Sequence, residues 1–447
     1  MKIFNLIRLN ASAYKVTFDK AVLYYIFLFF NFLVGFRVLL ETIFQVIDLA
    51  LEAIYLGVIF LYLGYRVSKR IFTSNFRLNP FELLLSMLFL LPFLGGFSAY
   101  LEWGQPLLYG IGTFRDFYLI FGALIVYNML RNKEIDISLV EQAWVSVAWF
   151  NMILFYGMTF LVDPSQFQET GAAGANELKG GDVYFRFNMS YMFFGSIYYA
   201  IKAIMKRKSI YLLYAALFLI YIVFFRLDRT TILVSVGAIG AFFLFRMSLK
   251  SKVLNLLKFG IPAILLIVLT LMLFPEEYTK YYVMFSDIFT TVSSVDNTTS
   301  EQSIRLTELN IALEYIEKNP WIGSGKVSGQ WVEGGFQHFL GFFFISDIGI
   351  AGQVFVYGFI GLIVLYSQFL FALFFGLKIG PLKKNVFLMT CQFFLLALFV
   401  DSFSNGYLSM YAAHSINAIM VIYYFYEQDK IVRVKNHIED YNAKAIG

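Results

Sequence analysis

Apolar runs of about 20 residues recur along most of this chain, beginning near Ala21, and short polar segments separate them. A helix of about 20 apolar residues is long enough to cross the hydrocarbon core of a bilayer. The pattern predicts about twelve transmembrane helices. Their predicted starts lie near residues 21, 43, 81, 107, 143, 187, 209, 230, 255, 350, 385 and 407. The predicted fold class is an all-α polytopic membrane protein, a single integral membrane domain over residues 1–447.

Composition narrows the class of protein further. Hydrophobic residues make up 59% of the chain and charged residues only 15%, so a soluble domain would expose too much apolar surface. The net charge of +5 is small for 447 residues, and no nucleic-acid partner is expected. The first run, residues 21–40, is too long for the apolar core of a signal peptide, and we expect it to be retained as a span.

Basic residues predict the orientation, because cytoplasmic loops of membrane proteins are enriched in Lys and Arg. Alternate loops of the predicted topology carry such residues: Arg66, Lys69, Arg70 and Arg77 in one, residues 206–208 in the next, Arg246, Lys250 and Lys252 in a third, and Lys378, Lys383 and Lys384 in a fourth. Both termini are therefore predicted to be cytoplasmic, and the polar residues 427–447 are predicted to form a cytoplasmic tail.

The longest polar interval, residues 275–338, falls on the opposite, external side and is acidic on balance. Positive charge on that side runs against the orientation bias, so external arginines call for a structural partner or an anionic ligand. These arginines are Arg186, Arg226, Arg229 and Arg305. For Arg186 and Arg229, which lie at predicted span ends, the alternative is snorkelling into the lipid headgroups.

The second half of this interval carries a helix signal followed by a turn signal. Apolar residues recur at helical spacing after a Thr-Thr-Ser sequence, which predicts an amphipathic helix over residues 301–318. Pro320 disfavours the helical conformation at Asn319, so the helix should stop there. The W-I-G-S-G sequence that follows reads as a turn in which Gly323 and Gly325 allow close backbone approach. This turn either presents backbone N–H groups to an anion or is a plain connection.

Few catalytic residue types are available outside the membrane. The external loops contain no D-x-D, H-E-x-x-H, P-loop or G-x-S-x-G sequence, so metal-assisted, nucleotide-hydrolysing and serine-hydrolase chemistry lose their usual support. Cys391 is the only cysteine, which excludes an intramolecular disulfide. Arginine and one external histidine, His338, remain. Guanidinium groups bind phosphate oxygens bidentately, and a neutral imidazole accepts a proton near pH 7.

Both of these residues also have an ordinary structural interpretation. A lone histidine is usually structural. Arg305 could form surface pairs with Glu301 or Glu308 along its helix, each worth a few tenths of a kcal/mol.

Arg115 and Asp116 lie inside the fourth apolar run. An arginine that faces lipid there costs about 2.5 to 3.5 kcal/mol. Arg115 is therefore predicted to face a cavity or an acidic partner, and Asp48 and Glu52 of the second run are candidate partners. Arg226 is a further candidate for lining such a cavity.

The external interval as a whole resembles a known pattern. An arginine in an amphipathic helix, a Pro-x-x-Gly-x-Gly turn, a histidine about a dozen residues later and an acidic-x-Gly-x-x-Gly step resemble the O-antigen ligase and O-antigen polymerase family of bacterial membrane glycosyltransferases. The residues that carry the resemblance are Arg305, Pro320, Gly323, Gly325, His338, Asp347, Gly349 and Gly352. Arg186 and Arg229 resemble two further family arginines, although Asp228 replaces the usual serine, the glycine often found after Arg186 is missing, and Phe339 replaces the asparagine that often follows the histidine.

The resemblance implies glycosyl transfer from an undecaprenyl-pyrophosphate-linked donor to a glycan acceptor, at the periplasmic face of the bacterial inner membrane and without a metal or other cofactor. It implies that Arg186, Arg229 and Arg305 hold the pyrophosphate and that His338 acts on the acceptor hydroxyl. Our hypothesis is a polymerase that joins oligosaccharide repeat units into surface polysaccharide, such as O-antigen, capsule or exopolysaccharide, with a chain-length regulator protein as a candidate partner.

Two alternatives stay open. One is a ligase that transfers the glycan to lipid A-core or another acceptor. The other belongs to a different class, a flippase that moves lipid-linked oligosaccharide without making a bond.

Overall fold

The structure is a computed structural model that describes residues 20–28, 45–72, 79–163, 176–179, 182–185, 187, 189–226, 229–246, 301–380, 384–403 and 412–446. Residues 20–28 are helical. The elements that follow are α3 (Gln45–Phe72), α4 (Pro80–Phe89), α5 (Leu91–Trp103), α6 (Leu107–Gly112), η1 (Arg115–Ile120), α7 (Phe121–Arg131), α8 (Ile137–Leu161), β1 (Asn176–Lys179), β2 (Asp182–Phe185), α9 (Ser190–Lys206), α10 (Ile210–Ile220), η4 (Tyr221–Arg226), α11 (Arg229–Arg246), α15 (Glu301–Lys318), α16 (Phe336–Leu340), η6 (Ile345–Ile348), α17 (Gly349–Lys378), α18 (Val386–Asp401) and α20 (Ala412–Ile446).

Three helical stretches within the described residues are long and apolar enough to cross a membrane, judged by length and composition. They are Pro80–Trp103, Ile137–Leu161 and Ile345–Lys378, and shorter apolar helices lie at Ala53–Tyr65, Phe117–Arg131, Ile210–Phe225, Ile232–Phe245 and Val386–Asp401. The described part of the chain is therefore consistent with the predicted all-α membrane protein, to which β1 and β2 add a short antiparallel hairpin. The span predicted from residue 255 lies outside the described residues, and a total of twelve spans stays a prediction.

The fourth predicted span, from residue 107, is not one continuous helix. α6 ends at Gly112, and a turn leads into the 3-10 helix η1, which begins at Arg115. α5 and α6 form a tight hairpin, in which a Cβ on Gly110 would lie only 2.8 Å from Cα of Gly96. The expectation that Arg115 lies inside a regular span is therefore wrong, because its backbone lies at a helix break.

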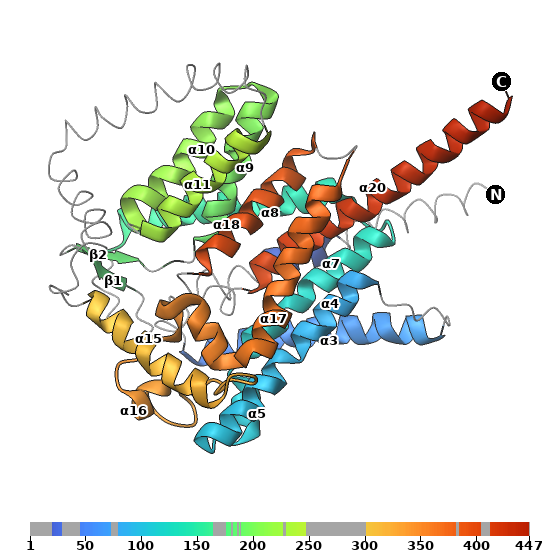
Figure 1. The fold of residues 1–447 in the computed structure, drawn as a ribbon. Coiled ribbons are helices and arrows are strands. Elements are labelled where there is room, and N and C mark those ends of the chain that lie inside the picture. The colour runs from blue at the N-terminus through green and yellow to red at the C-terminus, as the bar shows by residue number, and fades with distance from the viewer. Residues whose placement is uncertain are drawn as a thin grey trace, which may run out of the picture.

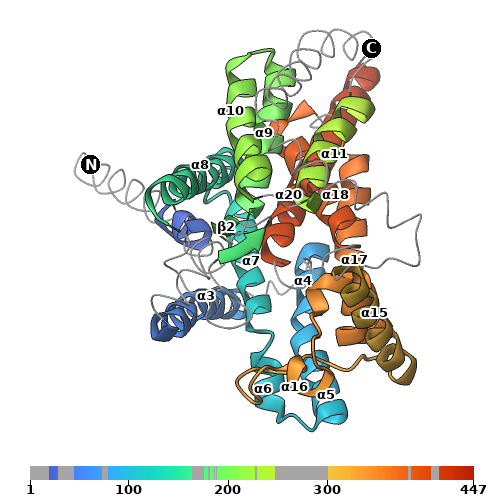
Figure 2. The same cartoon turned by 90° about the vertical axis from the view of Figure 1, so that its left-hand side faces the viewer.

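Helices α9 and α20 each pack against several other helices, and the C-terminal end of α20 projects away from the bundle (Figures 1 and 2). α9 packs against α8, α10, α11 and α18, whereas α20 packs against α7, α17 and α18. Aromatic rings fill much of the space between them, as where Trp144 of α8 stacks on Phe194 of α9 with ring centroids 4.5 Å apart. Large rings bury much apolar area per residue, which suits a chain that is 20% aromatic.

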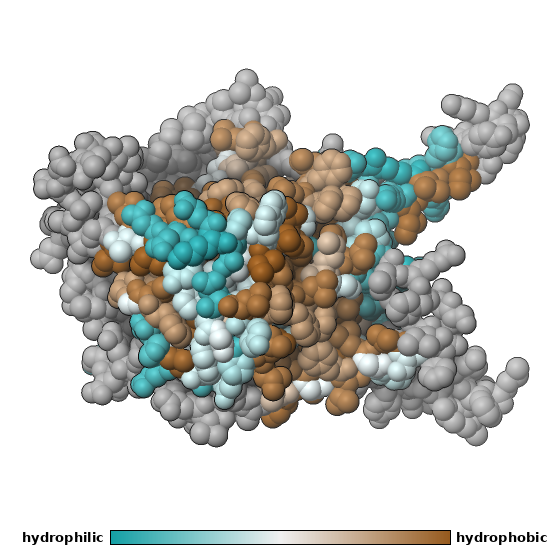
Figure 3. All heavy atoms as spheres, turned by 60° about the horizontal axis from the view of Figure 1, so that its bottom comes forward, coloured by the Kyte–Doolittle hydropathy of each residue, from teal (hydrophilic) through white to brown (hydrophobic). Residues whose placement is uncertain are grey.

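The surface divides into an apolar middle and polar ends. Figure 3 shows hydrophilic residues gathered on the side where α15 lies and again along α20, with a predominantly hydrophobic surface between them. β2 leads into the start of α9, so the basic turn at residues 206–208 lies at the end of α9 that is remote from the hairpin. Figure 1 shows the hairpin and α15 on the same side of the bundle. We call α15, α16 and the connection of residues 319–344 the cap.

Helix α17 is broken at Gly358, where φ is 62° and ψ is −174°. A break inside an apolar span leaves backbone groups without helical partners, and each such group costs roughly 2 to 7 kcal/mol if it stays unpaired. The 320–325 turn of the cap pairs with the groups on both sides of the break. The hydrogen bonds run from Ser324 N to Phe355 O (2.7 Å), from Gly325 N to Val356 O (3.0 Å), from Phe359 N to Pro320 O (2.8 Å) and from Ile360 N to Trp321 O (3.2 Å). The turn and α17 thus each contribute two carbonyl groups and two N–H groups to these four hydrogen bonds.

The end of α5 holds the same turn from the other side. Ser98 Oγ donates to Ile322 O at 2.8 Å, and Trp103 Nε1 donates to Ser324 O at 2.7 Å. Just beyond α5, Gln105 accepts from Ser328 N at 2.7 Å and donates to Lys326 O at 3.1 Å. The chain after α15 is thus fixed between α5 and α17.

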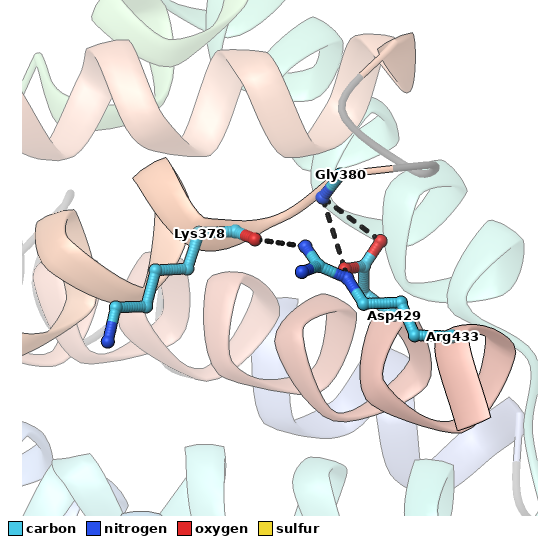
Figure 4. Close-up of polar contacts among 4 residues, drawn as sticks. All are labelled: Lys378, Gly380, Asp429 and Arg433. Carbon is cyan, nitrogen blue, oxygen red and sulfur yellow. Dashed lines mark hydrogen bonds and ion pairs between the residues drawn. The ribbon is translucent and has the colours of Figure 1, made fainter. Parts of the chain in front are cut away.

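At its other end, α17 is tied to α20 (Figure 4). Asp429 is buried on α20 and accepts hydrogen bonds from Gly380 N to both of its carboxylate oxygens, each at 3.1 Å. Arg433 donates from Nε to the same carboxylate at 2.8 Å and from a terminal nitrogen to Lys378 O. This contact anchors the C-terminal end of α17 to the last helix.

Replacing Gly325 with alanine should destabilise the protein by about 2 to 5 kcal/mol, because the new side chain is both strained and overpacked. Its φ is +74°, and a Cβ there would overlap the backbone of Ala99 and Gly95. The measurement is the free energy of unfolding of the purified protein in detergent.

Gly329→Ala is the matched control, since a Cβ at this exposed position meets nothing within 4 Å. Equal stability of the two variants would contradict the role assigned to the 320–325 turn.

Candidate functional site

Helix α15 spans Glu301–Lys318 and confirms the helix predicted over residues 301–318. Arg305 is exposed on it, but Glu308, three residues later, has no exposed surface. No ion pair joins these two side chains, so Arg305 does not form the surface pair with Glu308 that helical spacing allowed. The side chain of Glu301, the other possible partner, lies outside the described part of the structure. Leu313, an apolar residue of the same helix, is 45% exposed. The helix therefore turns a carboxylate inward and an arginine outward.

Glu308 connects α15 to the segment that follows His338. Its Oε1 accepts a hydrogen bond from Phe344 N at 2.9 Å, whereas its Oε2 is buried without a partner in the described part of the chain. Burial raises the pKa of this carboxyl above its ordinary value, and the nearby Asp347 adds to the rise, whereas the Phe344 N–H bond and Arg305 oppose it. A buried carboxyl with one unpaired oxygen favours the protonated form.

His338 lies on the short helix α16, and its side chain is exposed. Its ring contacts the ring of Phe339, with centroids 4.9 Å apart at 78°. One polar contact fixes the chain on each side of α16. Before α16, Ser328 N donates to the side chain of Gln105, and after it, Phe344 N donates to the side chain of Glu308. An exposed imidazole is thus carried by a segment that is anchored at both ends.

Aromatic packing fixes α16 against the helices beneath it. Trp103 of α5 stacks on Tyr315 of α15 at 5.1 Å between centroids and contacts Phe336 of α16 at 5.8 Å. Phe336 also packs against Phe343 and Phe355, at 5.7 and 5.4 Å. Because α5, α15, α16 and α17 share this cluster, the position of His338 relative to α15 is set by a common core.

Three N–H groups of the 320–325 turn donate hydrogen bonds within the protein. The N–H groups of Gly323, Ser324 and Gly325 all donate to backbone carbonyls, the first to Asn319 O at 3.0 Å and the others to α17. These three N–H groups are therefore already paired, and they are not available to an anion. Pro320, Gly323 and Gly325 belong to the junction with α17.

The other predicted arginines can be placed only through their surroundings. The side chains of Arg115, Arg186, Arg226 and Arg229, and that of Glu52, lie outside the described part of the structure.

Phe185 and Phe187, which flank Arg186 in sequence, are buried, and Phe187 stacks on Phe155 at 4.4 Å between centroids. Phe155 in turn contacts Tyr221, the first residue of the π-helical turn η4. That turn ends at Arg226, and α11 begins at Arg229. Chain segments next to three of the arginines therefore pack together, on the same side of the bundle as α15 (Figure 1).

Arg305 and His338 both lie on the cap, on separate helices joined by one aromatic cluster. No group of three His, Cys, Asp or Glu side chains within the described residues has the arrangement of a metal site. Sequence reasoning missed Trp103, Gln105 and Glu308, all of which support the segment that bears His338. Their sequence signal was slight: Trp103 and Gln105 end an apolar run, and Glu308 resembles a surface residue.

Comparison with known families adds one match. The model of the Wzy_C family, described as O-Antigen ligase, matches residues 214–366, about a third of the 447-residue chain. The matched region contains η4, α11 and the cap. It also contains α17 from its start at Gly349 to residue 366, and so includes the break at Gly358. The match supports a relationship to the O-antigen ligase and polymerase enzymes, and so to lipid-linked glycan transfer. Together with the apolar helices it supports a membrane protein. No curated protein matches the chain significantly.

Glu308→Gln should remove a pH dependence of stability, because glutamine keeps an acceptor for Phe344 N–H but cannot ionise. A carboxyl whose pKa is raised on folding contributes stability below the ordinary glutamate pKa near 4.3, and this contribution is lost as pH rises through the raised value. We expect the wild-type melting temperature to fall over that range more than that of Glu308→Gln.

The measurement is thermal unfolding in detergent at a series of pH values, starting near 4. Glu314→Gln is the control, because Glu314 is exposed on the same helix and pairs with Lys318 at 2.8 Å. Parallel curves for wild type and Glu308→Gln would show that Glu308 does not change ionisation on folding.

Proposed function

We propose that this protein is a polymerase that joins undecaprenyl-pyrophosphate-linked oligosaccharide repeat units on the periplasmic face of the bacterial inner membrane. The observation that carries the proposal is the family match over residues 214–366, which includes the cap with Arg305 and His338. The polar cap over an apolar helix bundle supports it, since such a substrate has a lipid tail and a polar glycan. In this proposal the cap faces the periplasm and both chain termini face the cytoplasm.

The proposed reaction moves one glycosyl group. An acceptor hydroxyl oxygen forms a bond to the anomeric carbon of the donor sugar, and the bond from that carbon to the pyrophosphate oxygen breaks. His338 accepts the proton of the attacking hydroxyl, which an imidazole can do near neutral pH. The pyrophosphate leaves with its bonding electron pair and remains on the polyprenyl carrier.

Arginines would stabilise the charge that develops on the leaving group. Arg305 is exposed on the cap, and a guanidinium there can bind phosphate oxygens bidentately. Arg186 and Arg229 are proposed to complete this pyrophosphate site. Phe187, next to Arg186, packs through Phe155 against η4, and η4 also contacts α11, which begins at Arg229. Removing a charged donor that is aimed at developing charge commonly lowers a rate by about 100- to 1000-fold.

A ligase is the second candidate, because the matching family carries the description O-Antigen ligase. Polymerase and ligase share the donor and the bond made, and they differ in the acceptor. Purified protein supplied with lipid-linked repeat units alone elongates them if it is a polymerase. A ligase needs added lipid A-core or another acceptor. A flippase would only move the substrate across a vesicle membrane.

We expect His338→Ala and Arg305→Ala to abolish long surface glycan in a knockout strain and to lower the transfer rate in detergent by at least about 100-fold. Arg305→Lys should recover only part of the activity, because an ammonium cannot bind phosphate bidentately. The measurements are surface-glycan length by gel and product formed per unit time.

Two controls match these changes in residue type. His437→Ala removes an exposed histidine on α20, and Lys318→Ala removes an exposed cation on the same helix as Arg305. Unchanged surface glycan in the His338 and Arg305 variants, or an equal loss of glycan in the two control variants, would contradict the proposed roles.

A further inference from the structure

Two aromatic rings reach the surface of the cap beside His338. Trp331 and Phe339 lie nearly parallel, with centroids 6.0 Å apart and an interplanar angle of 21°. Phe339 is 41% exposed and Trp331 is half-buried. Phe339 also contacts the ring of His338 at 4.9 Å. The pair is therefore an accessible aromatic surface in direct contact with the candidate base.

This surface is rigidly supported from below. Trp103 backs Phe339 at 5.2 Å between centroids, and the indole N–H of Trp103 is fixed by its hydrogen bond to Ser324 O. Phe336, one turn from Phe339, is buried in the shared aromatic cluster. The packing therefore holds Phe339 in place without covering it. A binding surface that is fixed before the ligand arrives loses little entropy on binding.

Polar groups lie close to the aromatic pair in sequence. The indole N–H of Trp331 has no hydrogen-bond partner in the described part of the chain. Close by in sequence, Gln330 and Glu333 are exposed and Gln337 is half-buried. None of these three side chains makes a hydrogen bond to another described residue. Exposed aromatic faces and nearby amide and carboxylate side chains on one short segment give this part of the cap an amphipathic character.

That combination matches the chemistry of a sugar ring. A pyranose presents a face of polarised C–H groups, which is attracted by the negative face of an aromatic ring, and a rim of hydroxyls, which pair with amides and carboxylates. A lipid chain would match the rings but would leave the polar rim unpaired. The exposed Trp321, which contacts Phe359 at 6.3 Å on the other side of the junction, suits a lipid-interface role better.

We propose that Trp331 and Phe339 form a subsite for a sugar ring of the glycan acceptor and hold that ring next to His338. The assignment to the acceptor rests on the proposed function, because His338 is the group proposed to deprotonate the acceptor. The subsite recognises the ring and not the lipid carrier. Losing its aromatic face should therefore raise KM for the acceptor and leave kcat nearly unchanged.

The test compares Trp331→Phe, which keeps an aromatic ring, with Trp331→Leu, which keeps only apolar bulk. Both variants leave a large apolar side chain at this half-buried position, so folding should be preserved. Trp321→Leu is the matched control, because it removes an exposed tryptophan elsewhere on the cap. The probe is the repeat-unit oligosaccharide that mild acid releases from the host cell's lipid carrier, titrated into the full-length protein in detergent.

We expect Trp331→Leu to weaken oligosaccharide binding and to raise KM for the acceptor by about five- to tenfold. Trp331→Phe should stay within about twofold of the wild type and Trp321→Leu should be unchanged. Equal binding by the Phe and Leu variants, or an equal loss in Trp321→Leu, overturns the subsite. If the wild type transfers no glycan but still binds the oligosaccharide through Trp331, the sugar site stands and the transferase proposal falls.

Discussion

The backbone pairing between the 320–325 turn and the break in α17 is the constraint on which the cap depends. A span interrupted at Gly358 would leave carbonyl and N–H groups unpaired in an apolar bundle, and the turn supplies the matching groups from outside the helix. The two segments therefore support each other: the break in α17 gives the turn partners for its backbone groups, and the turn pairs the groups that the break leaves open. Gly323 and Gly358 permit the close approach, since a Cβ on either would overlap backbone atoms of the other segment. The cap is consequently part of the bundle and not a loop laid over it.

From this junction the chain reaches His338 through a segment that is held at two points. Ser328 is fixed to Gln105 at 2.7 Å, and Phe344 is fixed to Glu308 at 2.9 Å. Between these points the short helix α16 buries Phe336 and exposes His338. A base of transfer chemistry needs a defined distance to its substrate, and two-point anchoring supplies this without burying the imidazole. The carboxyl of Glu308 is costly to bury, and its hydrogen bond to Phe344 N offsets part of that cost.

The helical, apolar character of the described chain could be read from the sequence, because long hydrophobic runs are typical of membrane helices. α15 begins and ends where spacing and Pro320 predict. The break at Gly358 could not be predicted, because the run around it is uniformly apolar and contains several glycines, and only the partner backbone shows which one interrupts the helix. Glu308 was misassigned for a similar reason. Helical spacing placed it beside Arg305, but its hydrogen-bond partner, Phe344 N, lies 36 residues away in sequence. A local sequence pattern cannot predict a contact over that separation.

The functional unit is accordingly larger than the region that carries the family match. That region, residues 214–366, contains both sides of the junction at Gly358 and both candidate catalytic residues, but it does not contain α5. Yet Trp103 fixes the turn through its indole N–H and supports Phe339 through its ring. Gln105 holds the chain that leads to α16. Since these two contacts help to set where His338 and its aromatic neighbours lie, the end of α5 belongs to the site as much as the cap does, and any account of acceptor specificity has to include it.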